Sequence, residues 1–114
     1  MNKKPNLRVV KKPRDNIDER DAFAIIRDLV QADDGRVVLR THLKQRMQER
    51  QISRTQIDNV LLGQHSKMIE GPFQKTNGRW NCKIRGIAAG RDLQVVVDID
   101  IDHNGEKVIV VTAF

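Results

Sequence analysis

The sequence predicts an α+β fold in which N-terminal helices pack on one face of a four-stranded antiparallel sheet. Apolar residues repeat at helical spacing in the first half of the chain and then alternate with polar residues from about residue 66. Two Asn-Gly pairs, at 77–78 and 104–105, separate the alternating segments, and this dipeptide favours tight hairpin turns. Helices followed by hairpin-linked strands are typical of α+β domains.

The composition predicts a flexible basic arm over residues 1–16 and a single α+β domain over residues 17–114. The first fourteen residues hold two prolines and six lysines or arginines without an acid, so they bury too little apolar surface to become ordered. Cys82 is the single cysteine, which excludes an internal disulfide and a cysteine-based metal site. We expect a cytoplasmic protein with no membrane segment, since no apolar run has the length of a span.

The first helix is predicted from Asp18–Glu19 to about Ala32, because its apolar residues recur at helical spacing and acids occupy its first turn. Residues 36–40 are too short for assignment and are either a short strand or an extended segment leading into the next helix. That second helix is predicted at 42–51 with Thr41 as its N-cap.

A third helix is predicted at 54–62, with Ser53 as its N-cap and Gly63 at its end. The four strands are predicted at Ser66–Glu70, where Gly71-Pro72 ends the first, and at Arg79–Ile87, Leu93–Ile101 and Lys107–Ala113. In the second strand Trp80, Cys82 and Ile84 share one face, whereas Arg79, Asn81, Lys83 and Arg85 share the other.

The most informative feature lies on the second helix, where His42, Arg46 and Arg50 are spaced four residues apart and fall on one stripe. Leu43 and Met47 form an apolar stripe beside them, so one edge of the helix packs while the next faces outward. Guanidinium groups hold a phosphate and an imidazole moves a proton, which suits phosphate chemistry. The alternative is an ordinary solvated helix face.

The charge pattern indicates a polyanionic partner. Residues 36–91 hold twelve lysines and arginines against three acids, whereas the segments on either side are acidic. We therefore assign nucleic-acid binding to Lys44, Arg79, Lys83 and Arg85, with RNA or another nucleic acid as the partner. The alternative is ordinary exposure with cross-strand pairing to Asp98 and Asp100. One tryptophan and no tyrosine argue against a platform of stacked bases.

No metal site or cofactor is predicted. Residues 100–105 match the first half of a calcium-binding loop, but Val111 stands where a bidentate glutamate is required. A hairpin with a polar tip explains this segment better, and the scattered histidines do not suggest zinc.

The pattern His42-x3-Arg46-Met47-x2-Arg50-x-Ile52-Ser53, the helix ending at Gly63 and the closing strand over 108–112 resemble domain-of-unknown-function family 4258. This family is placed with the RelE/ParE-like toxins and the wider barnase-like ribonuclease fold, and the resemblance covers residues 36–114. It implies a RelE-like sheet with RNA as substrate and without a metal. It also implies that His42 is the general acid or base, that Arg46 and Arg50 hold phosphate, and that Thr112 contacts substrate.

Three functional hypotheses follow. The first is a metal-independent ribonuclease, the toxin of a toxin–antitoxin pair, which acts on RNA phosphodiesters and has an antitoxin protein as a further partner. The second is a non-catalytic nucleic-acid-binding module, a helix-turn-helix followed by a winged sheet, although the third helix offers only Arg54 and includes Asp58. The third is a protein-interaction domain that uses the acidic first helix.

Overall fold

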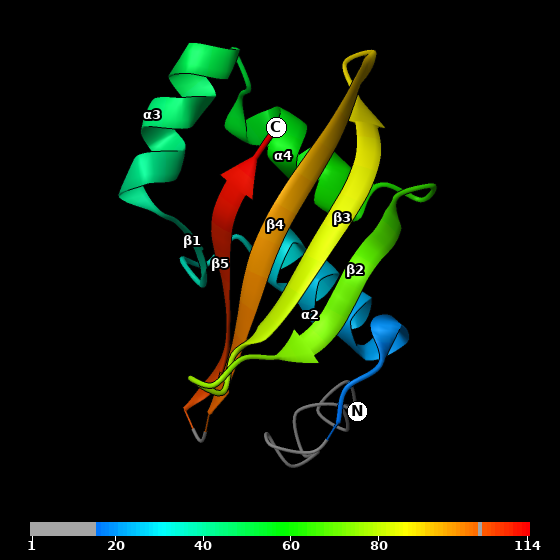
Figure 1. Ribbon diagram of the computed structural model, residues 1–114, viewed down its shortest axis with the longest axis vertical. Helices are drawn as coiled ribbons and strands as arrows, with labels where there is room; N and C mark the ends of the chain where they lie inside the picture. The colour runs from blue at the N-terminus through cyan, green and yellow to red at the C-terminus, as the bar shows by residue number, and fades with distance from the viewer. Residues whose placement is uncertain (1–15, 103) are drawn as a thin grey trace.

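The computed structural model describes residues 16–102 and 104–114, so the predicted basic arm and His103 lie almost wholly outside the described residues. The elements are α2 (Glu19–Ala32), β1 (Val37–Leu39), α3 (Thr41–Arg50), α4 (Arg54–Leu62), β2 (Lys67–Gln74), β3 (Trp80–Ala88), β4 (Arg91–Asp102) and β5 (Gly105–Ala113). The α+β class is confirmed, and Figure 1 shows α2 and α4 on one face of the sheet, with α3 beside the end of β5. Within the described ranges, no helix is both long and apolar enough to cross a membrane.

The sheet has five strands in the order β1-β5-β4-β3-β2, so the prediction of four antiparallel strands was wrong. The additional strand is β1, which pairs in parallel with β5 from Val37 opposite Val108 to Leu39 opposite Val110. Three residues carry too little periodicity to be recognised as a strand. Their pairing depends on a partner about seventy residues later in the chain, which local sequence patterns do not encode.

Two predicted boundaries also change. Thr41 is the first residue of α3 rather than its N-cap, because Arg40 takes the N-cap position with an extended backbone and no side-chain capping bond. Strand β2 continues through Gly71-Pro72 to Gln74, with register shifts on both sides of Glu70. Gly71 has a φ of +90°, and a Cβ there would strike the carbonyl oxygen of Asn81, so this continuation requires glycine.

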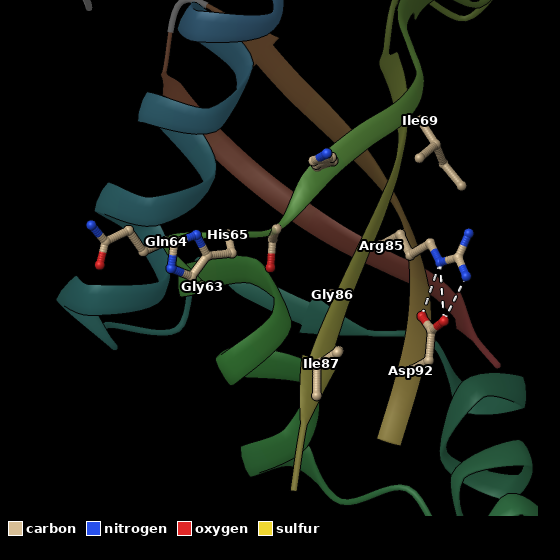
Figure 2. Close-up of a pocket in the computed structure, with 10 residues that line it drawn as sticks. Gly63, Gln64, His65, Ile69, Arg85, Gly86, Ile87 and Asp92 are labelled. Atoms are coloured by element: carbon tan, nitrogen blue, oxygen red, sulfur yellow. Dashed lines mark hydrogen bonds and ion pairs between the residues drawn. The ribbon is translucent and has the colours of Figure 1, made fainter. Parts of the chain in front are cut away.

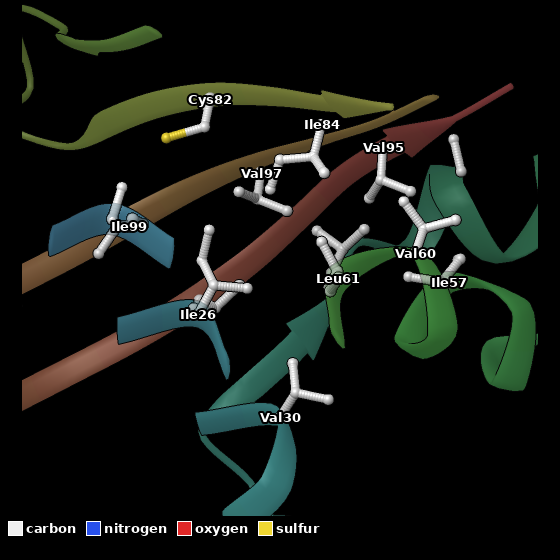
Figure 3. Packing of buried hydrophobic residues seen from close by; sticks show 14 of the residues in the cluster. Ile26, Val30, Ile57, Val60, Leu61, Cys82, Ile84, Val95, Val97 and Ile99 are labelled. Carbon is white, nitrogen blue, oxygen red and sulfur yellow. The ribbon is translucent and has the colours of Figure 1, made fainter. Parts of the chain in front are cut away.

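The core lies between the sheet and the two helices α2 and α4, as Figure 3 shows for Ile26, Val60 and Ile84. The predicted inward faces are confirmed, since Trp80, Cys82 and Ile84 are all 5% exposed or less. The sheet therefore has a helix face, which this core covers, and an open face on its other side. We use these two names below.

Helix α4 packs mainly against β3 through Ile57, Val60 and Leu61, all fully buried. Its N-terminus is fixed by a capping box: the Ser53 hydroxyl oxygen accepts from the Gln56 N–H, and the Gln56 side chain accepts from the Ser53 N–H. This capping box confirms Ser53 as the predicted N-cap of α4. It lies in the short connection between α3 and α4. Because its apolar side is buried against the sheet, α4 does not project from the domain as the recognition helix of a helix-turn-helix does when it enters the major groove of DNA.

We predict that Ser53→Ala lowers the free energy of unfolding by about 1 kcal/mol, because it leaves the Gln56 N–H without its acceptor. Urea denaturation monitored by circular dichroism measures the change. Thr55→Ala is the matched control, since Thr55 is exposed on the same helix, and it should leave stability nearly unchanged. Equal effects of both substitutions would contradict a specific role for the cap.

Candidate functional site

Helix α3 is held against the free edge of β5. Leu43 is 1% exposed and belongs to the core, with Met47 packed against it. The Nη1 of Arg50 donates a 2.7 Å hydrogen bond to the carbonyl oxygen of Ala113. At the C-terminus of α3, the Arg91 guanidinium donates to the carbonyl oxygens of Arg50 and Gln51, at 3.1 and 2.6 Å. The helix dipole stabilises a positive charge at this end. Arg50 thus joins α3 to the sheet edge.

The other two members of the predicted stripe are exposed. His42 lies in the first turn of α3, and Arg46 lies one turn further, with its guanidinium 3.7 Å from the Glu49 carboxylate. Both side chains of that pair are about half exposed, so the pair contributes little to the stability of the fold. The Arg46 guanidinium can therefore bind an anion from solution. The structure therefore divides the stripe into one partly buried anchor, Arg50, and two exposed groups.

Lys44 lies on a different flank of α3. It lines a shallow hollow of about 360 Å³ together with Gln48, Gln51 and Ser53, where the chain turns into α4. At 100° per residue, His42 and Arg46 fall on the opposite flank of the Leu43–Met47 line. Lys44 is therefore separated from His42 and Arg46 on the surface of α3.

Thr112 lies on the open face of β5, beside α3. It pairs with Val96 of β4, which pairs in turn with Lys83 of β3, so these three side chains form one row across the sheet. Adjacent strands are separated by about 4.8 Å, which puts Thr112 and Lys83 about 10 Å apart. The open face thus carries a hydroxyl and an ammonium group in one row that begins on β5, the strand that α3 contacts.

Cations on and beside the open face of β3 are paired with acids, although only Arg79 has one of the two partners, Asp98 and Asp100, that the alternative interpretation named. Lys83 reaches Glu70 at 3.2 Å, Arg85 reaches Asp92 at 2.6 Å, and Arg79 reaches Asp100 at 3.5 Å. Through its hydrogen bonds the Arg85 guanidinium lowers the pKa of Asp92 below its ordinary value. The basic strand face is thus a set of ion pairs rather than a row of free cations.

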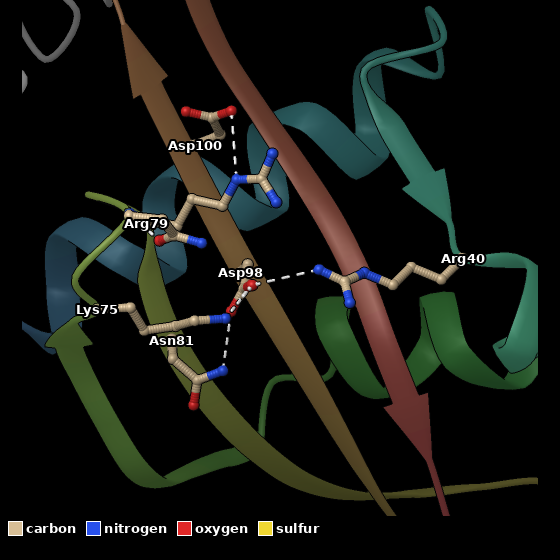
Figure 4. A network of polar contacts seen from close by, with 7 residues as sticks. Arg40, Lys75, Arg79, Asn81, Asp98 and Asp100 are labelled. Atoms are coloured by element: carbon tan, nitrogen blue, oxygen red, sulfur yellow. Dashed lines mark hydrogen bonds and ion pairs between the residues drawn. The ribbon is translucent and has the colours of Figure 1, made fainter.

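One cluster was missed by the sequence analysis. Asp98 is fully buried on the open face, accepting from Lys75 Nζ at 2.7 Å and from Asn81 Nδ2 at 2.8 Å, with an Arg40 Nη 3.9 Å away (Figure 4). The alternation marked Asp98 as a pairing partner, but only the fold brings Arg40 and Lys75 to it. Behind it, burial first and then the Asp98 charge raise the pKa of the Cys82 thiol to about 12, so Cys82 stays protonated at neutral pH.

Comparison with known proteins identifies a family. A family model described as "Domain of unknown function (DUF4258)" matches residues 39–114. The match runs from the end of β1 to Phe114, so it includes α3 and nearly all of the open face and leaves α2 outside. No curated protein and no solved structure matches the chain.

We predict that Arg50→Ala lowers the free energy of unfolding by about 1.5 kcal/mol, because it removes a charge-assisted hydrogen bond from the carbonyl of the buried Ala113 at the strand edge. Arg46→Ala is the matched control on the same helix, and its effect should stay within about 0.5 kcal/mol. Urea denaturation compares the two variants. An Arg46 effect as large as that of Arg50 would contradict this division of roles.

We predict that Asp98→Asn destabilises the fold by about 2 kcal/mol, because it leaves the Lys75 ammonium and the Arg40 guanidinium without their shared carboxylate. Thermal and urea unfolding measure the loss. Asp100→Asn serves as control: the Asp100 side chain is 30% exposed and pairs with Arg79 at 3.5 Å, so its removal should cost less than about 1 kcal/mol. Equal stability of Asp98→Asn and the unmodified chain would show that this cluster does not support the sheet.

Proposed function

The chain belongs to the DUF4258 family, and on that premise we propose that it is a metal-independent ribonuclease-like domain that acts on RNA phosphodiesters where α3 meets the open face. One observation carries the proposal: His42 and Arg46 are exposed on α3, the helix that packs beside β5, and β5 carries Thr112 in one open-face row with Lys83. We place the imidazole, the two cationic groups and the hydroxyl on one side of the molecule, where together they can cleave a phosphodiester.

In the proposed reaction the 2′-hydroxyl of the RNA attacks the adjacent phosphate. The imidazole of His42 takes the hydroxyl proton while the 2′-oxygen forms its bond to phosphorus. The bond from phosphorus to the 5′-oxygen breaks, and water gives that oxygen a proton, so the products are a 2′,3′-cyclic phosphate and a 5′-hydroxyl. Arg46 and Lys83 hold the non-bridging oxygens as negative charge accumulates there, and Thr112 donates a hydrogen bond.

We also propose a RelE-like arrangement for the domain, of the kind found in ribonuclease toxins. Two helices on one face of the sheet, with the last strand beside the helix that carries His42, support this relationship. The parallel β1 makes the sheet five-stranded, and α2 adds a helix before the matched region. In this arrangement Arg50 holds α3 in position rather than holding phosphate.

Binding of RNA without cleavage is the second candidate. Among the described residues, His42 is the only imidazole on the α3 side of the domain, because His65 follows α4 and lines a cleft beside β2 and β3. A single imidazole serves one proton transfer, and the second transfer then depends on water. The same surface would bind phosphates through Arg46 and Lys83 in either case.

Cleavage of end-labelled RNA by the purified chain in EDTA tests the proposal. We expect fragments that end in a 2′,3′-cyclic phosphate, with the rate reduced about 100-fold or more in His42→Ala. Arg46→Ala should reduce the rate about tenfold or more through loss of charge stabilisation. Arg20→Ala is the matched control, because Arg20 is exposed on α2 on the other side of the sheet, and it should cleave at the unmodified rate.

Circular dichroism verifies that each variant is folded. Intact RNA after incubation with the unmodified chain, together with salt-sensitive RNA binding, would reject the ribonuclease and support the second candidate. Cleavage that persists in His42→Ala would reject the assignment of His42 as the proton-transfer group.

A further inference from the structure

A cleft of about 600 Å³ opens beside the end of β3 that lies farthest from Trp80. There Gly86 and Ile87 extend beyond the first residue of β2, because Lys67 pairs with Arg85. Figure 2 shows Ile69 and Arg85 on the open-face side of this cleft and His65 on the side of the helices. Its volume is within the range of pockets that hold ligands the size of a nucleotide.

Large apolar side chains are exposed on the open face close to this cleft. Ile87 is 72% exposed, Ile69 is 44% exposed and Phe114 is 45% exposed. Phe114 pairs with Gln94 through two backbone hydrogen bonds, and Lys83 Nζ lies 5.7 Å from the centre of its ring. A ring of this kind, held beside a cation and open to solvent, suits a base that stacks while its phosphate meets the cation.

Two neighbouring rows connect the cleft with Thr112 on β5 and with Phe114, the residue after β5. One row passes through Gln94 and Arg85 to Lys67, and the row beside it passes through Lys83. From β5 to β2 this path crosses three strand intervals, about 14 Å. Arg85 has five N–H donors, and Asp92 takes only its Nε–H and one Nη2–H, so the guanidinium keeps donors for a phosphate.

The formal charges of the two sides support a polyanion on the open face. Among the described residues the open face carries seven lysines and arginines against five acids: Arg40, Lys67, Lys75, Arg79, Lys83, Arg85 and Lys107 against Glu70, Asp92, Asp98, Asp100 and Asp102. The segment 18–34, which contains α2, holds six acids against two arginines on the other side of the sheet. Electrostatic attraction therefore directs a polyanion to the open face.

We propose that single-stranded RNA crosses the open face from α3 to this cleft, with one base stacked on Phe114 and another seated beside Ile87. Lys83 and Arg85 contact the phosphates between them. This inference rests on the proposed function and adds a substrate class to it. In a duplex the faces of the bases are covered by neighbouring base pairs. A duplex base therefore cannot stack on Phe114 or enter the cleft.

Fluorescence anisotropy with a labelled single-stranded RNA, and with a duplex of the same sequence, tests the proposal in EDTA. The parent for all comparisons is His42→Ala, so that cleavage does not change the ligand during the measurement. Phe114→Ala and Ile87→Ala should each weaken binding of the single strand about fivefold to tenfold or more, without a comparable change for the duplex. Val38→Ala is the matched control: Val38 is 40% exposed on β1, away from the path, and should bind like the parent.

Equal affinity of the parent for single strand and duplex, or unchanged binding of the single strand by Phe114→Ala and Ile87→Ala, would overturn the proposal. Its failure is distinct from failure of the ribonuclease. RNA left intact by the unmodified chain, with single-strand binding that depends on Phe114, would reject cleavage and keep this path. Cleavage that depends on His42, with affinity that Phe114→Ala does not alter, would keep the ribonuclease and reject the path.

Discussion

The structure depends on how the two edges of β5 are completed. One edge pairs with β4, and the other pairs with β1 only as far as Val110, so the last residues of β5 would present unpaired backbone groups. The guanidinium of Arg50 supplies the donor for the Ala113 carbonyl, and Leu43 anchors the same helix in the core. This requirement holds α3, with His42 and Arg46 exposed on it, beside β5.

Folding also separates the charges of the chain. The acids around α2 lie across the sheet from the open face, where cations outnumber acids. Within the open face Asp98 is fully buried and draws Lys75 and Arg40 toward β4, while Lys83 and Arg85 remain near the exposed Phe114. The part of the open face around Asp98 is therefore fixed by a buried carboxylate. The part around Phe114 keeps exposed apolar groups beside Lys83 and Arg85, whose ion pairs with Glu70 and Asp92 lie at the surface.

The α+β class, the helix and strand periods and the Ser53 cap could be predicted from the sequence. Each depends on the spacing of residues that are close together in the chain. It did not allow β1 to be recognised, since three residues acquire their strand identity only from β5. The candidate site was predicted as one stripe of α3, but spacing places residues on a helix without showing what lies opposite each one. The Ala113 carbonyl accepts the hydrogen bond from Arg50, and it lies 63 residues further along the chain.

The aromatic content bears on the same surface. The lack of tyrosine and the single tryptophan argued against a platform of stacked bases, and Trp80 is buried in the core. Stacking depends on which rings are exposed rather than on how many the chain contains, and Phe114 is exposed beside Lys83. Because Phe114 follows β5, the edge constraint that positions α3 also fixes this ring through its pairing with Gln94. One strand thus connects the group proposed to move a proton with the surface proposed to hold the bases.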